Sequence, residues 1–124
     1  MTRALVHHKN WGEEHWIVNT EYCGKKLILN PGHKCSLHHH KKKDETFYLL
    51  SGHLIMEIPN HYYLMIPGDI IHIQPEINHR FWGLEPSEIL EISTHHEESD
   101  SYRLEPSGTF HAPDIKFELE PLPR

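Results

Sequence analysis

Short β-forming segments, each ended by a turn, constrain the fold of this chain more than any other feature of its sequence. Segment 46–50 reads Thr-Phe-Tyr-Leu-Leu and ends at Ser51-Gly52, and segment 53–58 alternates well enough to pair back across that turn. No stretch of about eleven residues keeps apolar side chains at the helical spacing. Further strands are expected at 25–29, 62–66, 70–73, 79–82 and 88–93. This succession in 124 residues predicts one all-β domain, a sandwich or barrel.

The domain is expected to have three parts. Residues 25–104 form the barrel core, and residues 1–24 form an N-terminal arm or edge strands around Trp11 and Trp16. Residues 105–124 contain four prolines and are expected to form a tail that packs on the barrel or on a partner subunit.

Composition excludes several classes of protein. The formal net charge of −6 argues against a nucleic-acid partner, which needs a basic face. No apolar run approaches the roughly 20 residues of a membrane helix, and from the pattern of residues 1–10 we expect no signal peptide. Cys23 and Cys35 make no secreted-type disulfide framework. We therefore expect a cytoplasmic protein without a membrane partner. The run Lys41–Lys43 is expected in a solvated loop, with attraction of an anionic substrate as the alternative.

Fourteen histidines, many of them clustered, point to a metal site. On a strand, His38 and His40 lie on the same face and form a clamp for a metal ion, whereas Cys35 would face away if the strand is regular. Glu45 opens the next strand, and a short antiparallel return places it opposite the two histidines. The residue pattern leaves the fourth ligand open among His33, His53, His61, His72 and His79.

The spacing of these residues resembles the first motif of the cupin family. That motif consists of a glycine, a His-x-His pair, a glutamate and a second glycine. Gly32, His38, His40, Glu45 and Gly52 match all of its positions.

The second cupin motif is matched less closely. Gly68 and His79 fit it, but Gln74 replaces the usual proline and Glu76 the usual glycine. The resemblance implies a double-stranded β-helix, or jelly-roll, barrel that holds one divalent metal ion, which could be Mn, Fe, Co, Ni or Zn. The resemblance also implies that the metal ligands are His38, His40, Glu45 and His79.

A looser similarity links the chain to the cupin domains of mannose-6-phosphate isomerases, through Trp11-Gly12, Leu37 and His79-Arg80. It implies a sugar or sugar-phosphate isomerase or epimerase in which the metal ion acts as a Lewis acid. An Fe(II)-dependent dioxygenase is the alternative, and a non-catalytic module that binds metal or carbohydrate is a further one. Small cupins often pair, so we expect a homodimer with Trp11, Trp16 and the tail between the subunits.

Four other side chains are candidates for the site. His72 and Glu91 lie in strands otherwise rich in Ile and Leu, where they either line the pocket or face solvent. Because Glu45 would be a ligand, these two are the candidate catalytic bases. Arg103 could bind an anionic group of the substrate, together with Tyr102. His96, in the mixed-charge run 95–100, is expected in a solvated loop.

Overall fold

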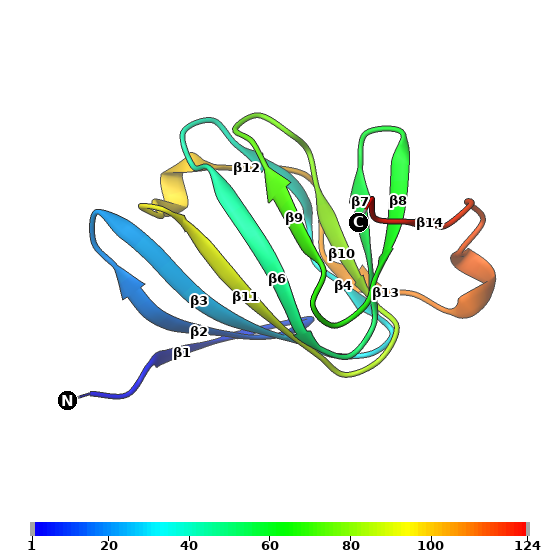
Figure 1. The fold of residues 1–124 in the computed structure, drawn as a ribbon, viewed down its shortest axis with the longest axis horizontal. Helices are drawn as coiled ribbons and strands as arrows, with labels where there is room; N and C mark the ends of the chain where they lie inside the picture. Colours follow the sequence, from blue (N-terminus) through cyan, green and yellow to red (C-terminus); the bar gives the residue numbers. More distant parts are fainter. Residues whose placement is uncertain (1, 124) are drawn as a thin grey trace.

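The computed structural model describes residues 2–123 and consists of two large β-sheets that face each other (Figure 1). The first sheet contains, in order across it, β1 (Leu5–Lys9), β2 (Gly12–Asn19), β3 (Tyr22–Leu29), β11 (Ser87–Thr94), β6 (Glu45–Ser51) and β9 (Ile70–Ile73). The second contains β13 (Gly108–Thr109), β4 (His33–Lys34), β10 (Arg80–Gly83), β7 (Leu54–Ile58), β8 (His61–Met65) and β14 (Glu120–Pro121). Strands β5 (Leu37–His40) and β12 (Ser101–Glu105) form a separate antiparallel pair. The predicted all-β class is confirmed.

Helical structure among residues 2–123 is limited to two 3-10 turns, η1 (Glu98–Asp100) and η2 (Ala112–Asp114). Neither approaches the length of a membrane-spanning helix.

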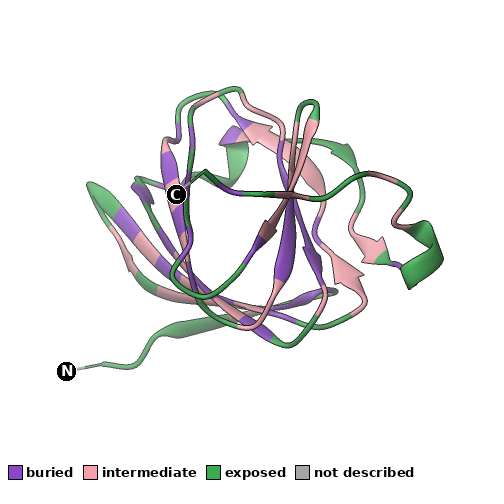
Figure 2. Ribbon diagram, turned by 45° about the vertical axis from the view of Figure 1, so that its right-hand side comes forward, coloured by how far each residue is buried: buried purple, intermediate pink, exposed green. Residues whose placement is uncertain are grey.

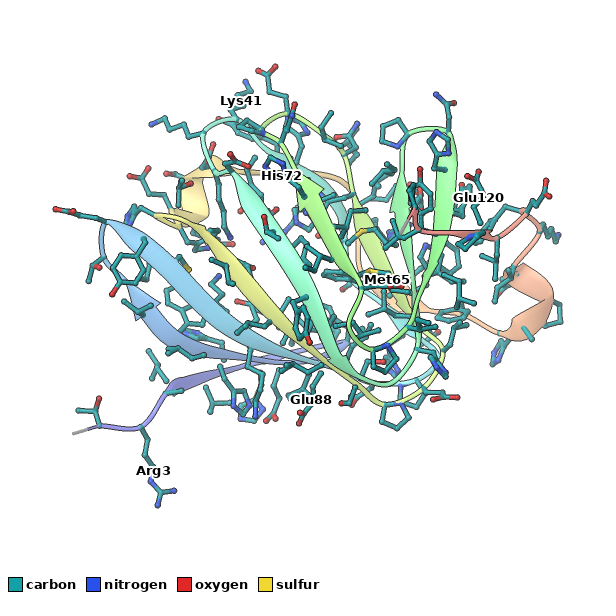
Figure 3. The ribbon with its side chains drawn as sticks, in the orientation of Figure 1. Arg3, Lys41, Met65, His72, Glu88 and Glu120 are labelled. Atoms are coloured by element: carbon teal, nitrogen blue, oxygen red, sulfur yellow. The ribbon has the colours of Figure 1, made fainter. Side chains whose placement is uncertain are left out.

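Alternating burial along the strands places one face of each sheet in the interior (Figure 2). On β11, Ile89, Glu91 and Ser93 are buried, whereas Leu90 and Ile92, which alternate with them, are more exposed. At one end of the interior the buried side chains are apolar, and Met65, labelled in Figure 3, lies among them. At the other end the sheet presents charged side chains to the interior, and Glu45 and Lys25 are among them. Since buried charges need partners, this polar end is where a site is expected.

The β6–β7 hairpin depends on Gly52. Its φ is +87°, in the left-handed region, and a Cβ there would lie 2.3 Å from the carbonyl oxygen of Pro86. Both facts explain why a glycine is needed at this turn.

The two ends of the chain pack on the barrel. Strand β2 pairs with β3, and β1 forms the edge of the first sheet. In the tail, β14 runs parallel to β8, and Phe110 and Leu122 are buried. Trp11 is buried in the core of its own chain, so it does not offer the partner surface that was expected of it.

Candidate metal centre

Three histidines converge at the polar end of the barrel. His38 and His40 lie on β5, and His79 lies immediately before β10. A backbone bridge joins His38 to His79, with N–H···O distances of 3.2 and 2.9 Å. One ring nitrogen from each of the three histidines lies within 4.8 Å of the other two.

Backbone carbonyls fix the orientation of all three rings. Nδ1 lies 2.8 Å from Ser36 O in His38, 3.1 Å from Asp100 O in His40 and 2.9 Å from Ile77 O in His79. A carbonyl oxygen only accepts hydrogen bonds, so each Nδ1 must carry the hydrogen and donate it. Each Nε2 then has a free lone pair, which is the arrangement found in histidine metal ligands.

Glu45 lies against two of these histidines. Its Oε2 lies 3.0 Å from Nε2 of His79 and 3.5 Å from Nε2 of His40. Oε2 of Glu45 and Nε2 of His79 are nevertheless both buried without a hydrogen-bond partner. Buried polar atoms without partners are rare in native proteins, and a cation bound between these two atoms would satisfy both of them. Three imidazoles and a carboxylate fit a divalent transition metal ion.

The protonation states of the group also fit a cation. Burial, and then the nearby His79, lowers the pKa of His38 to about 3, and burial lowers the pKa of His40 as well. Burial alone would raise the pKa of Glu45, but His79, Lys43 and His40 hold it below its usual range. At neutral pH His38 and His40 are therefore neutral and Glu45 is ionised, as metal ligation requires.

Lys43 lies beside this group and is almost fully buried. The prediction of a solvated loop is therefore wrong for this residue, although it holds for Lys41, which is exposed (Figure 3). The loop is bent inward because the carboxylate of Asp100 accepts the backbone N–H groups of residues 41–43. Lys43 has the same strand parity as Glu45, which is the one signal in the sequence for its inward direction.

His96 is also buried, contrary to the expectation of a solvated loop. Its Nδ1 lies 3.0 Å from Nζ of Lys43, and its Nε2 lies 3.2 Å from Glu98 Oε2. Burial, followed by Lys43 and Lys25, lowers the pKa of His96 to about 4. The adjacent His95 is exposed, so residues 95–100 form no second histidine cluster.

The three histidines and Glu45 face a cavity of about 300 Å³. One side is polar, with Glu14, Lys25 and Glu91 projecting from the first sheet. Apolar side chains, among them Trp11 and Phe81, form part of the remaining wall. The cavity therefore combines an apolar surface with many hydrogen-bonding groups, as small-molecule sites do.

The other candidate residues divide between the cavity and the outer surface. Glu91 and Arg103 line the cavity, and Arg103 forms an ion pair of 2.7 Å with Glu98. Tyr102 projects from the opposite face of β12 and stacks on His39, with a centroid distance of 5.2 Å. His72 is exposed on the outer face of β9 and pairs with Asp44 (Figure 3). Neither Tyr102 nor His72 lines the cavity, because each alternates with inward-facing neighbours on its strand.

Cys35 also lines the cavity, contrary to the prediction from strand parity. Residues 35 and 36 lie between β4 and β5, so the chain is not one regular strand there. The Cys35 sulfur accepts the backbone N–H of Phe81 at 3.2 Å, and burial raises the pKa of its thiol to about 11. Cys35 and Cys23 are both free thiols.

The degenerate second motif still forms its turn. Glu76 has a φ of +73°, a left-handed conformation at the position where the family motif has glycine. Its backbone N–H donates to His40 O at 2.6 Å, which ties the turn to the histidine strand. The replaced glycine therefore leaves a strained residue but does not displace His79.

Comparison with known proteins identifies the class to which this fold and site belong. A family model described as the cupin domain matches residues 26–93, more than half of the chain. The chain belongs to the cupin family. Among curated proteins, an oxidoreductase of Arthrobotrys oligospora is 30% identical over 70 residues, which are 56% of this chain and 28% of that protein. The chain thus spans less than a third of that relative.

Solved structures share the fold at low identity. KdgF from Halomonas sp. matches with a TM-score of 0.70 and 16% identity over 77% of this chain and 91% of that one. CapF of Staphylococcus aureus, a capsular polysaccharide assembling protein, gives 0.73 and 17% over 85% of this chain and 32% of that one. An oxalate decarboxylase of Bacillus subtilis matches with a TM-score of 0.71 and 18% identity, over 82% of this chain and 30% of that one. These similarities concern the fold, which is the predicted jelly-roll cupin barrel.

Proposed function

We propose that this cupin is a metal-dependent isomerase or epimerase of a sugar or sugar phosphate. The observation that carries the proposal is the buried, unpartnered pair of Glu45 Oε2 and His79 Nε2 beside a polar cavity. When bound by the three histidines and Glu45, a divalent metal ion would supply Lewis-acid polarisation of adjacent hydroxyl and carbonyl oxygens. Polyhydroxylated substrates suit the cavity, because its polar side offers both hydrogen-bond donors and acceptors.

Glu91 is the candidate for the base that moves the proton between neighbouring carbons. Three donors approach its Oε2: Lys43 Nζ at 2.6 Å, Ser93 Oγ at 3.1 Å and Cys23 Sγ at 4.0 Å. Among residues 2–123, no hydrogen bond to its Oε1 is formed, so that oxygen is available to a substrate in the cavity. His72, the other candidate base, is exposed on the outside of the barrel and does not line the cavity.

Arg103 is proposed to bind an anionic group such as a phosphate. It lies across β12–β5 from His38 in the strand register, at the cavity wall. Its present partner Glu98 is exposed, so a phosphate could compete for the guanidinium at low cost.

An Fe(II)-dependent dioxygenase is a second candidate, favoured by the similarity to the oxidoreductase of Arthrobotrys oligospora. One experiment separates the two functions. The metal-free protein is loaded anaerobically with Mn, Fe(II), Co, Ni or Zn and incubated in D₂O with a panel of aldoses and their phosphates. Deuterium incorporation next to the carbonyl without O₂ supports the isomerase, and turnover that requires O₂ supports the dioxygenase. A Glu45→Gln variant is the control for metal dependence.

We also propose that the chain forms a homodimer. The outer face of the first sheet carries a row of neighbouring apolar side chains, Ile70, Tyr48 and Leu90, with Ile92 beside it. Ile70 and Ile92 are 60% and 57% exposed. A second copy covering this face would bury these side chains.

A further inference from the structure

We infer that Lys43 is a positioning residue that limits Glu45 to binding the metal ion through one oxygen. This inference rests on the proposed metal site and concerns a residue outside the ligand group. It explains why a lysine is buried within a cluster of candidate cation ligands, where its charge would otherwise oppose metal binding.

The two oxygens of Glu45 have different surroundings. Oε2 faces Nε2 of His79 at 3.0 Å and Nε2 of His40 at 3.5 Å. Oε1 lies 3.4 Å from Nζ of Lys43. A carboxylate that binds a metal ion through both oxygens must turn both toward it. The ammonium group attracts Oε1, and Oε2 is the oxygen that lies next to the histidine nitrogens. A coordination position that a second oxygen would occupy is thereby left for substrate.

Lys43 itself is held in place from three directions. Besides Glu45 Oε1, its Nζ lies 2.6 Å from Glu91 Oε2 and 3.0 Å from His96 Nδ1. An ammonium group has three hydrogens, and three acceptors are present. The backbone around Lys43 is fixed by Asp100, which accepts the N–H groups of residues 41–43. The side chain therefore cannot turn to solvent without breaking several buried interactions, as a positioning role requires.

The same contacts link the ligand Glu45 to the candidate base Glu91. Both carboxylates lie against a single ammonium group, which reduces the repulsion between them. Together the three groups carry one positive and two negative charges, so the cluster still has a net negative charge to attract a cation.

Lys25 provides a matched control within the same cavity. It is as deeply buried as Lys43, with exposures of 2% and 3%. Its Nζ lies 3.4 Å from Glu14 Oε1 and 4.3 Å from the centre of the Trp16 ring, and it contacts none of the four proposed ligands. A Lys25→Met variant thus removes a buried ammonium group without disturbing Glu45.

The test compares Co²⁺ binding in the full chain with Lys43→Met, Lys43→Arg and Lys25→Met. Co²⁺ affinity is measured by competition with a chelating dye, and the visible absorption of bound Co²⁺ reports the number and type of its ligands. We expect Lys43→Met to weaken Co²⁺ binding by roughly ten- to hundredfold, the usual effect of losing a residue that orients a ligand. The Co²⁺ spectrum should change as Glu45 reorients, and Lys43→Arg should partly restore both readouts. Lys25→Met should leave affinity and spectrum unaltered.

A second variant guards against loss of folding. Lys43→Met leaves Glu91 buried without its cation, so Lys43→Met/Glu91→Gln removes that unpaired charge while Glu45 Oε1 still lacks the ammonium group. Wild-type affinity and spectrum in the double variant would overturn the inference, as would equal losses in Lys25→Met. Absence of stoichiometric Co²⁺ binding by the wild-type protein would instead overturn the proposed metal site.

Discussion

Oε2 of Glu45 and Nε2 of His79 lie 3.0 Å apart in the interior of the barrel, and neither atom has a hydrogen-bond partner. The two residues come from opposite sides of the barrel, Glu45 from β6 and His79 from the turn before β10. The chain therefore places an unpartnered acceptor and an unpartnered ring nitrogen together in the interior. This costs free energy unless a third group satisfies both atoms.

A metal ion that satisfies these atoms should stabilise the protein. We expect about one equivalent of a divalent metal ion in the purified, tag-free wild-type protein, and none in a His38→Ala/His40→Ala variant. Metal analysis by mass spectrometry measures this directly. Added metal should raise the Tm of the wild-type protein, because a ligand that binds only the folded state stabilises it. The same addition should leave the Tm of the double variant unchanged. No stoichiometric metal in reconstituted wild-type protein would contradict the assignment.

The metal-free protein should become less stable as the pH is lowered through a defined window. Burial lowers the pKa of His38 from 6.5 to about 3, so between these values the unfolded chain binds more protons than the folded one. The free energy of unfolding should therefore decrease as pH falls from about 6.5 to about 3, by at most about 1.4 kcal/mol per pH unit for this group. Urea titrations at a series of pH values measure the slope. A His38→Gln variant should have a shallower slope, and an identical slope would contradict the prediction.

Glu76→Gly should stabilise the protein. Glu76 is exposed and has a φ of +73°, so its side chain loses no buried contact on removal, and the strain of a left-handed conformation disappears. We expect a net gain of about 0.5–1 kcal/mol in the free energy of unfolding. The greater flexibility of glycine in the unfolded chain offsets part of the relieved strain. Asn60→Gly is the matched control. Asn60 is also exposed, with a φ of +66°, but asparagine tolerates this region, so the gain should be smaller. Equal gains in the two variants would contradict this explanation.

The sequence predicted the strand pattern and the four residues that meet at the polar end of the barrel. Strand alternation determines which side chains share a face, and so His38, His40 and Glu45 could be placed from spacing alone. His79 could not, because five histidines were equivalent in pattern. Only the family resemblance selected it, and the structure places it beside the other three.

Other features of the site depend on contacts between distant parts of the chain. The inward bend at Lys43 is set by Asp100, 57 residues later, and no local pattern contains that information. The position of Cys35 depends on an interruption between two short strands. On β9, Ile70 is exposed on the same face as His72, whereas Ile71 is buried. Because both faces of this strand carry apolar residues, the sequence pattern could not show which face is the outer one.

The outer face of the first sheet should mediate self-association. Light scattering at micromolar concentration should give the mass of a dimer for the wild-type protein. An Ile92→Lys variant should be monomeric, because a charge would have to be buried in the interface. Leu104→Lys, at a similarly exposed position on β12, should remain dimeric. A wild-type protein that is only monomeric would contradict the proposal.

Glu91→Gln should separate proton transfer from metal binding. In the wild-type protein, Nζ of Lys43 lies 2.6 Å from the Glu91 carboxylate. Glutamine keeps an oxygen that can accept a hydrogen bond from Lys43, but it cannot take a proton from a substrate. We expect kcat to fall by about 10²–10⁴-fold, the usual contribution of a general base. The Kd for Co²⁺ should change by less than about tenfold, since Glu91 is not among the proposed ligands. His72→Ala is the comparison, because its side chain faces solvent on the far side of the sheet and its loss should leave kcat unaltered. Steady-state kinetics on the substrate identified in the D₂O panel, with Co²⁺ titrations of both variants, make the measurement. If Glu91→Gln retained full activity, a group other than Glu91 would have to move the proton.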